Sequence, residues 1–306
     1  MQILVTGGAG FIGSHVVDAC LAAGHRVSVV DDLSAGKREN VNPAATLHVV
    51  DLCDQAALTE VIARERPEVI YHLAARANVR ESMVKPVLYA QVNIIGSLNL
   101  LEAARAHGCR KIVYASTGGA AYGEPQYLPA DEDHPINPLD PYGASKHHVE
   151  HYLFIYKFNY GLDYTVLRFP NVYGPRQDPY GEAGVVAIWA NLMLNGGQPV
   201  INGSGEQERD FVYVADIARA NLLSIDKGGG TIINLGSGIG TPIIDVFRAL
   251  REATGSTCAE AHAPAKLGEV FRIYLKSERA RELFGWEPEV SLREGLARTV
   301  AHFRQA

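Results

Sequence analysis

Two side chains that could move a proton together, Tyr142 and Lys146, stand four positions apart in the segment Tyr142-Gly143-Ala144-Ser145-Lys146. On a helix this spacing places the phenol and the ammonium group on one face. A free phenol has a pKa of about 10, which is too high for a base at neutral pH, but a neighbouring cation lowers it by stabilising the phenolate. The pair is therefore suited to acid/base work in hydride transfer. Because solvated helix faces often carry the same two residues, this interpretation depends on finding a cofactor site.

A glycine-rich turn near the N-terminus predicts that site. Gly7, Gly10 and Gly13 follow an apolar run and precede an amphipathic stretch, so they are expected to join a strand to a helix. Residues without a side chain let backbone N–H groups touch a pyrophosphate, and the helix N-terminus favours its negative charge. Asp31 ends the second predicted strand, where its carboxylate can accept both adenosine ribose hydroxyls and repel a 2′-phosphate. The pattern predicts NAD rather than NADP, although Lys37 and Arg38 lie nearby.

The elements that must position these residues alternate along the first half of the chain. Short β-branched runs predict strands, and amphipathic stretches predict helices between them. Because parallel strands need crossover connections, the alternation predicts a parallel sheet covered on both faces. Five prolines within 122–141 predict an ordered surface loop. The expected strands are 3–6, 27–31, 47–51, 69–73, 111–116 and 164–169, and the expected helices are 11–23, 54–66, 83–107 and 142–160.

The second half has a more irregular pattern, rich in glycine and proline. It predicts short strands at 199–202 and 209–213, a strand at 231–235 that rejoins the main sheet, and helices at 184–195, 214–225, 242–254, 277–284 and 291–304. The fold class is therefore α/β, a Rossmann-type doubly wound parallel sheet with a smaller, interleaved C-terminal lobe. We expect the cofactor-binding domain to comprise 1–169 with a return segment at about 208–237. The substrate lobe would comprise 170–207 and 238–306.

Composition excludes several classes of protein. The chain has 306 residues, of which 47% are hydrophobic and 20% charged, as in ordinary globular proteins. Lys and Arg number 28 and Asp and Glu 34, a net charge of −6 that argues against binding nucleic acid or an anionic membrane. The four cysteines form no Cys-x-x-Cys pair, and neither a leader peptide nor a membrane-spanning run is apparent. These features predict a cytoplasmic protein.

Taken together, the motifs resemble those of the extended short-chain dehydrogenase/reductase family, and within it the UDP-glucose 4-epimerase group. The resemblance extends over essentially the whole chain. Motifs of the cofactor half are Thr6–Ser14, Asp31-Asp32-Leu33-Ser34, Asp51-Leu52, His72-Leu73-Ala74-Ala75 and Tyr142–Lys146. Motifs of the nucleotide-sugar branch are Glu81-Ser82-x-x-Lys85-Pro86, Arg168–Arg176, Arg209-Asp210-Phe211-Val212, Asn234–Gly238 and Gly285-Trp286-Glu287-Pro288.

The resemblance implies a set of site residues. Those implied for NAD are Gly7, Gly10, Phe11, Ile12, Gly13, Asp31, Asp32, Asp51, Leu52, Leu73, Ala74, Ala75 and Asn93, with Tyr142 and Lys146 at the nicotinamide ribose. Those implied for the pyrophosphate and sugar of a UDP-sugar are Lys85, Asn171, Arg209 and Lys266. At the last position the family usually has Arg, whose planar fork grips two phosphate oxygens where Lys offers one point charge. A homodimer is also implied, in which helix 142–160 packs against its twin.

The residues after the fifth strand favour one reaction of this family. Dehydratases and decarboxylases carry an acid just after the strand-end threonine, where this chain has Gly118 and Gly119. The hydroxyl that remains, Thr117 or Ser116, can relay a proton between Tyr142 and the sugar. The sequence thus predicts a UDP-glucose 4-epimerase that interconverts UDP-galactose and UDP-glucose through a 4-keto sugar. The alternatives are an epimerase of UDP-N-acetylhexosamine or UDP-uronate and a non-catalytic NAD-binding protein.

Two further features of the sequence concern the pocket and a possible metal. Ile273 aligns where some relatives carry a bulkier Tyr that restricts the sugar's 2-substituent, so an N-acetyl group is expected to fit as a secondary substrate. His147 and His151 have the i, i+4 spacing of metal ligands, with His148 between them. No third ligand has a suitable spacing, so we expect no metal site.

Overall fold

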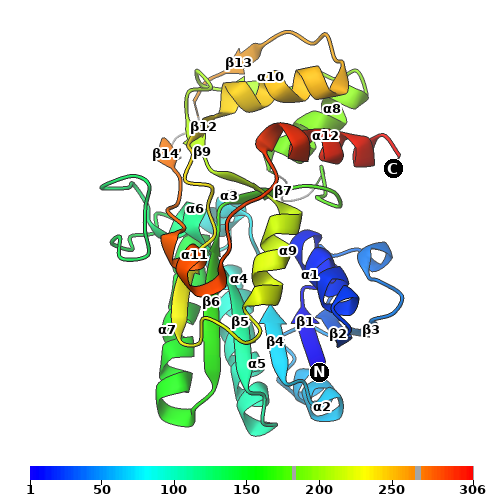
Figure 1. The fold of residues 1–306 in the computed structure, drawn as a ribbon, viewed down its shortest axis with the longest axis vertical. Helices are drawn as coiled ribbons and strands as arrows, with labels where there is room; N and C mark the ends of the chain where they lie inside the picture. Colours follow the sequence, from blue (N-terminus) through cyan, green and yellow to red (C-terminus); the bar gives the residue numbers. More distant parts are fainter. Residues whose placement is uncertain (181–183, 266–269, 306) are drawn as a thin grey trace.

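A seven-stranded parallel sheet forms the centre of the computed structural model, which describes residues 1–180, 184–265 and 270–305. Figure 1 shows the sheet in the lower part of the molecule, below a smaller lobe. The strands lie in the order β11-β6-β5-β4-β1-β2-β3, as expected for a doubly wound fold. Their bounds are β1 Gln2–Thr6, β2 Arg26–Asp31, β3 Thr46–Val49, β4 Val69–His72, β5 Lys111–Thr117, β6 Asp163–Phe169 and β11 Thr231–Asn234. The last of these pairs with β6, so the expected return of 231–235 to the sheet is confirmed.

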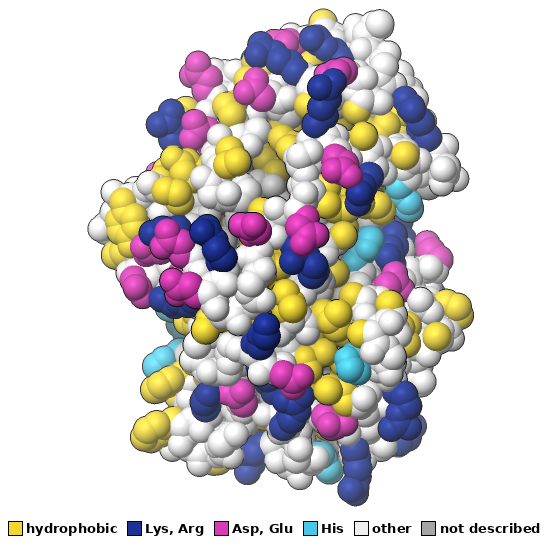
Figure 2. Space-filling model, viewed as in Figure 1, with side chains coloured by type: hydrophobic (Ala, Val, Ile, Leu, Met, Phe, Trp, Pro, Cys, Tyr) yellow, Lys and Arg dark blue, Asp and Glu magenta, His cyan; other side chains and the backbone are white. Residues whose placement is uncertain are grey.

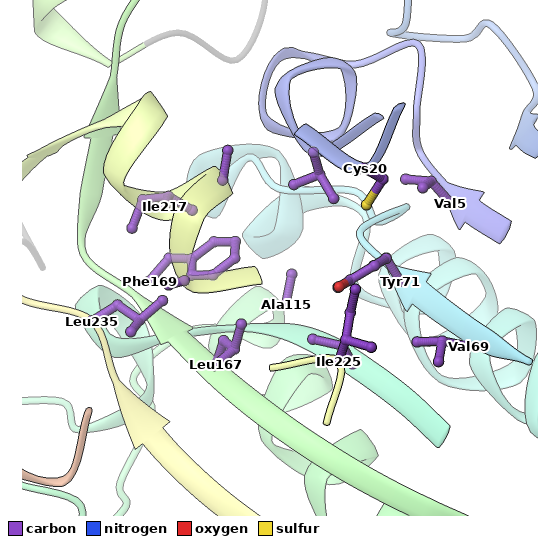
Figure 3. Close-up of a cluster of buried hydrophobic side chains, with 14 of the residues drawn as sticks. Val5, Cys20, Val69, Tyr71, Ala115, Leu167, Phe169, Ile217, Ile225 and Leu235 are labelled. Carbon is purple, nitrogen blue, oxygen red and sulfur yellow. The ribbon is translucent and has the colours of Figure 1, made fainter. Parts of the chain in front are cut away.

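Helices cover both faces of the sheet because consecutive side chains along its strands are apolar and point alternately to the two faces. Ile3 and Val5 pack on one face with α1 (Phe11–Ala22) and α9 (Val214–Leu223), and Figure 3 shows part of this core. Leu4 packs on the other face with α2 (Gln55–Glu65), α5 (Gly96–Ala106) and α7 (Pro141–Tyr160). The two faces together fix the carboxyl ends of the strands, where the site residues follow.

The helix expected over 83–107 is confirmed from Pro86 to Ala106, but it begins later than predicted and is not α-helical throughout. The structure instead has α3 (Val79–Val84), α4 (Pro86–Tyr89), a π-helical segment Ala90–Ile95 and then α5. Pro86 lacks a backbone N–H, so it begins a helix and cannot continue the one before it. The π-helical segment carries the buried Asn93.

The proline-rich segment 122–141 is an ordered connection, as expected. It follows the short helix α6 (Gly118–Ala121) and ends where Asp140 caps α7. At its middle, the backbone of Ala130 exchanges hydrogen bonds with the strand segment around Leu275. The loop therefore links the end of β5 to the C-terminal part of the chain.

Among the described residues, three further helices and several short strands lie in the smaller lobe and along its border with the main sheet. Their bounds are α8 Val185–Leu194, α10 Ile243–Thr254 and α12 Leu292–Phe303, with β7 Asn171–Tyr173, β8 Val200–Asn202, β9 Glu208–Arg209, β10 Phe211–Tyr213, β12 Thr241–Pro242, β13 Ala261–Ala263 and β14 Arg272–Ile273. The helices share one hydrophobic cluster around Trp189 and Phe247. A further helix, α11 (Glu278–Phe284), packs near the sheet by β11. Strands of two or three residues carry too little periodicity to be predicted, which is why β7, β12, β13 and β14 were not expected.

The surface of the molecule mixes both charges. On the face drawn in Figure 2, Lys and Arg side chains are interspersed with Asp and Glu side chains. Among the helices that the structure describes, none combines the length and the apolar character needed to cross a membrane.

Candidate active site

A cavity of about 1710 Å³ lies where the carboxyl ends of the strands meet the smaller lobe. Its wall on the sheet side includes Thr117 at the end of β5 and Tyr142 in the first turn of α7. Asn171 and Arg209 also line the cavity, and Lys85 lines it from the C-terminal end of α3. The structure therefore brings the predicted acid/base tyrosine and three predicted substrate residues to one cavity, although they are far apart in sequence.

The glycine turn has the geometry that close approach to a phosphate requires. Gly7 has a φ of +71°, and a Cβ there would lie 2.7 Å from the backbone nitrogen of Ala74. A Cβ on Gly13 would lie 2.0 Å from the carbonyl oxygen of Gly7. Gly10 caps α1 without a side chain, so the first N–H groups of that helix face outward from a bare backbone. These are the features of a cradle for a dinucleotide pyrophosphate.

Asp31 holds the same turn from the end of β2. Its carboxylate accepts hydrogen bonds from the backbone N–H groups of Ala9 and Leu33, both at 2.9 Å. Burial raises the pKa of this carboxyl, and the two backbone donors oppose the rise. The neighbouring Asp32 instead accepts from the backbone and hydroxyl of Ser34 at the surface.

The remaining residues predicted for NAD lie around this turn. Phe11 and Ile12 begin α1, and the buried Leu52 packs against Gly96 at the start of α5. Leu73, Ala74 and Ala75 follow β4, where the N–H of Ala74 donates to the Thr6 hydroxyl. Asp51 accepts from the N–H of Cys53.

Asn93 has a more structural placement than expected. Its amide oxygen accepts from the N–H of Arg76, and its nitrogen donates to the Arg76 carbonyl and to the Ser145 hydroxyl. The side chain thus ties the segment after β4 to the helix that carries Tyr142. Its direct contact with NAD stays a prediction.

Tyr142 and Lys146 lie in the first two turns of α7, whose start is fixed by a capping residue and a proline. Asp140 accepts from the N–H of Gly143 as an N-cap, and Pro141 occupies the first helical position. Lys146 is 3% exposed, and burial lowers the pKa of its ammonium group to about 7. Because Lys146 titrates near neutral pH, its charge state can change together with that of a neighbouring phenol.

The structure separates the two candidate hydroxyls at the end of β5. Thr117 lines the cavity, and its oxygen accepts from the N–H of Ala120 at 3.2 Å. Ser116 points to the other face of the strand, where its hydroxyl donates to Glu150 at 2.6 Å. Thr117 is therefore the hydroxyl that can meet a ligand.

Sequence reasoning missed a buried ion pair behind the cavity. Arg168 on β6 makes two parallel hydrogen bonds to Glu150 on α7, at 2.9 and 2.7 Å, and both residues are at most 3% exposed. Although burial opposes it, hydrogen bonds from Arg168 and other donors lower the pKa of Glu150 to about 2. Arg168 also donates to the Tyr122 hydroxyl, which donates in turn to Asn234. The signal was available, since Glu150 follows Lys146 by one turn and Arg168 interrupts an apolar strand.

The predicted substrate residues differ in their surroundings. Lys85 pairs with Glu81 at 2.8 Å and is about half exposed. Arg209 donates to the carbonyls of Glu208 and Phe271. Lys266 lies outside the described residues.

Ile273 pairs with Arg209 between β14 and β9. Its side chain is buried in a small cluster with Tyr122 and Leu275, whereas Val270 from the same segment lines the cavity. Ile273 therefore lies beside a substrate residue, and its control of sugar size stays a prediction.

The three histidines of α7 have other partners. His147 bonds Glu150, His148 bonds the Ala144 carbonyl, and His151 stacks on Phe154. Within the described part of the chain, no three His, Cys, Asp or Glu side chains gather as metal ligands.

Comparison with known proteins agrees with this geometry. Residues 3–236 match the model of the NAD dependent epimerase/dehydratase family. The UDP-glucose 4-epimerase of Mycolicibacterium smegmatis is 44% identical over 310 residues, which cover 99% of each chain. The structure of UDP-glucose 4-epimerase from Thermotoga maritima with UDP-glucose is 48% identical, with a TM-score of 0.98 over 100% of this chain and 99% of that chain. The Thermus thermophilus UDP-glucose 4-epimerase in complex with NAD is 45% identical, with a TM-score of 0.94 and full coverage of both chains. From its sequence, its fold and its glycine cradle, this chain belongs to the NAD-dependent epimerase/dehydratase family.

Proposed function

We propose that this protein is an NAD-dependent UDP-hexose 4-epimerase that interconverts UDP-galactose and UDP-glucose. The observation that carries the proposal is the cavity, which Thr117 and Tyr142 line together with Lys85, Asn171 and Arg209. The two hydroxyl groups suit a sugar, and the two cations, Lys85 and Arg209, suit a pyrophosphate. The similarity to UDP-glucose 4-epimerases over the full chain supports this substrate class.

The side chains have distinct roles in this reaction. The glycine turn and Asp31 would hold NAD, which supplies the hydride acceptor and donor for carbon 4. Tyr142 takes the proton of the sugar's 4-hydroxyl and later returns it. Lys146 stabilises the phenolate of Tyr142 and contacts the nicotinamide ribose. Thr117 relays the proton between the sugar oxygen and Tyr142.

The two glycines after Thr117 argue against elimination chemistry. A dTDP-glucose 4,6-dehydratase from Streptomyces venezuelae is 30% identical with a TM-score of 0.92, so the fold alone does not separate the two reactions. A Cβ on Gly118 would lie 2.3 Å from a methyl group of Leu275, so an acid there would have to displace that buried side chain. At Gly119 there is room, but the residue carries no carboxylate. Removing a carbon-5 proton needs such a base.

Epimerisation requires the 4-keto sugar to present its opposite face to the cofactor while the nucleotide stays anchored. We assign the anchoring to Lys85, Asn171 and Arg209. We also assign residues 1–169 and about 208–237 to the cofactor domain, and 170–207 and 238–306 to the substrate lobe.

A UDP-N-acetylglucosamine 4-epimerase from Methanobrevibacter ruminantium is 35% identical with a TM-score of 0.93, which supports the N-acetylated sugars as secondary substrates.

The proposal includes a homodimer in the cytoplasm. Phe154 and Phe158 stack along α7 and are 52% and 79% exposed. Val87 on the adjoining α4 is 80% exposed. A second copy that covers these side chains would remove them from water, and the molar mass in solution tests this. Four free cysteines support a reducing compartment.

The deciding experiment uses the purified protein. Denaturation should release NAD, because an enzyme that returns its hydride at each turnover has no need to exchange cofactor. UDP-galactose should be converted to UDP-glucose faster than the N-acetylated or uronate sugars are epimerised. Faster turnover of one of those sugars would identify an alternative epimerase. Bound NAD with no turnover of any of them would indicate a non-catalytic NAD-binding protein.

Replacing the two strand-end hydroxyls separately should have opposite consequences. Thr117→Ala is expected to lower kcat about tenfold, less than loss of Tyr142, because Tyr142 can reach the sugar oxygen through a water molecule. Ser116→Ala should leave kcat nearly unchanged and cost about 1 kcal/mol of stability, because it removes a buried hydrogen bond to Glu150. Steady-state kinetics and urea unfolding of both variants test the assignment. A larger kcat loss in Ser116→Ala would reverse it.

Asp31→Ala should weaken NAD binding and reduce the preference for NAD over NADP. The variant loses the acceptor for the ribose hydroxyls and the charge that repels a 2′-phosphate. Binding of both cofactors to protein freed of NAD measures the effect. Glu60→Ala is the control, because that acid is exposed on α2 and is not among the residues predicted for NAD. Tighter binding of NADP than NAD by the unmodified protein would contradict the role of Asp31.

A further inference from the structure

Lys146 lies over an aromatic ring. Its Nζ is 4.3 Å from the centroid of the Tyr114 ring, and Tyr114 is 1% exposed. The Tyr114 hydroxyl donates to the backbone carbonyl of Lys146 at 3.4 Å, so the two residues are joined at both ends. A cation held over an aromatic face in a site without water is strongly attracted to it.

The obvious anion beside Lys146 has other partners. Glu150 stands one turn further along α7, and its charge favours the ammonium form. However, its two oxygens already accept from Arg168, Ser116 and His147. A carboxylate neutralised by a bidentate arginine attracts a second cation less strongly.

His72, which packs against the Tyr114 ring, carries no positive charge that would repel Lys146. His72 on β4 packs against Tyr114 with ring centroids 5.4 Å apart. The Ser97 hydroxyl donates to the Asn93 carbonyl, so His72 must donate to Ser97 from Nε2, and its Nδ1 accepts from Thr6. Burial and Lys146 lower the pKa of His72 to about 3, so the ring is neutral at working pH.

We infer that the aromatic face of Tyr114 holds the buried ammonium of Lys146 in place as a cation beside Tyr142. Tyr114 is then a positioning residue for the acid/base pair, and this role rests on the proposed function of that pair. The charged and titratable groups around Lys146 are Glu150 on its own helix, Tyr114 on β5 and His72 on β4. Arg168 on β6 lies behind Glu150, and Tyr142 stands one turn before Lys146 on α7. Glu150 is shared with Arg168 and His72 is neutral, whereas the ring of Tyr114 offers Lys146 a stabilising face.

The inference predicts how Lys146 titrates. Tyr114→Leu keeps the apolar bulk but removes the aromatic face, so the midpoint of Lys146 should fall by roughly one pH unit from its value of about 7. Tyr114→Phe keeps the face and loses only the hydroxyl, so its midpoint should match that of the unmodified protein. Both are measured without substrate by NMR of protein labelled at the lysine Cε, with the signal assigned through Lys146→Met. Tyr114→Met serves as the second variant should the leucine variant fold poorly.

Turnover gives an independent reading. The alkaline limb of kcat against pH should move about one unit lower in Tyr114→Leu and stay in place in Tyr114→Phe. An unshifted Lys146 midpoint in Tyr114→Leu would overturn the inference, because the aromatic face would then make no contribution to that midpoint. An equal shift in Tyr114→Phe would also overturn it, because the hydroxyl and not the ring would then explain the shift. An unmodified protein that lacks epimerase activity would refute the proposed function alone, since the NMR titration still reports on Tyr114.

Discussion

Replacing Tyr142 with phenylalanine is expected to lower kcat by about 10²–10⁴-fold while NAD stays bound. The phenol oxygen is the proton acceptor and donor in the proposed reaction, and general acid/base catalysis is typically worth this factor. The ring itself is retained in the variant, so the cavity wall and the first turn of α7 keep their shape. Steady-state kinetics with UDP-galactose, together with NAD released on denaturation, measure the two quantities separately.

Tyr152→Phe is the matched control for this change. Tyr152 lies on the same helix as Tyr142 but packs against the hydrophobic core beneath the sheet. It should therefore keep normal kcat and NAD content. Near-normal turnover in Tyr142→Phe would remove Tyr142 from the mechanism. Loss of bound NAD from Tyr142→Phe would show that the hydroxyl also contributes to cofactor binding, and not to proton transfer alone.

The sequence allowed the sheet and its helices to be predicted because their signals are local. Each strand of the main sheet is a short run rich in apolar residues, and the helices between the strands predict a parallel sheet covered on both faces. The glycine turn was predictable for the same reason, since Gly7, Gly10 and Gly13 are required by contacts within a few residues and by the strand alongside. Tyr142 and Lys146 were found from their spacing on one helix.

The parts that could not be predicted depend on contacts between distant segments. Ser116 and Thr117 are adjacent in sequence, and only the orientation of β5 shows which one faces the cavity. The break of the helix at Pro86 was readable, but the π-helical segment after it is fixed by Asn93, which bonds to both Arg76 and Ser145. The contact of Lys146 with the Tyr114 ring depends on how α7 packs against β5. Pairings of this kind become visible only when the fold is known.

The buried pair of Arg168 and Glu150 should dominate the stability of the site. Arg168→Met leaves the Glu150 carboxylate buried without its bidentate partner, and removing one member of a buried ion pair costs about 3–5 kcal/mol. The exposed bidentate pair of Arg248 and Glu260 provides the control. Arg248→Met should cost less than about 1 kcal/mol, because water screens that pair. Urea unfolding at pH 7 measures both changes in free energy.

The pH dependence of the unfolding free energy shows whether the loss of stability in Arg168→Met comes from the charge of Glu150. In the unmodified protein the pKa of Glu150 is about 2, below its ordinary value of 4.5, so the pair contributes fully above pH 4.5 and its contribution is lost as pH falls towards 2. In Arg168→Met burial acts without the arginine, so the pKa of Glu150 should rise above 4.5 and the carboxyl should be neutral in acid. The difference in unfolding free energy between the two proteins should therefore shrink between pH 7 and pH 4.5. A difference that stays constant over this range would mean that Arg168 stabilises the fold through packing and its bond to Tyr122, and not through the charge of Glu150.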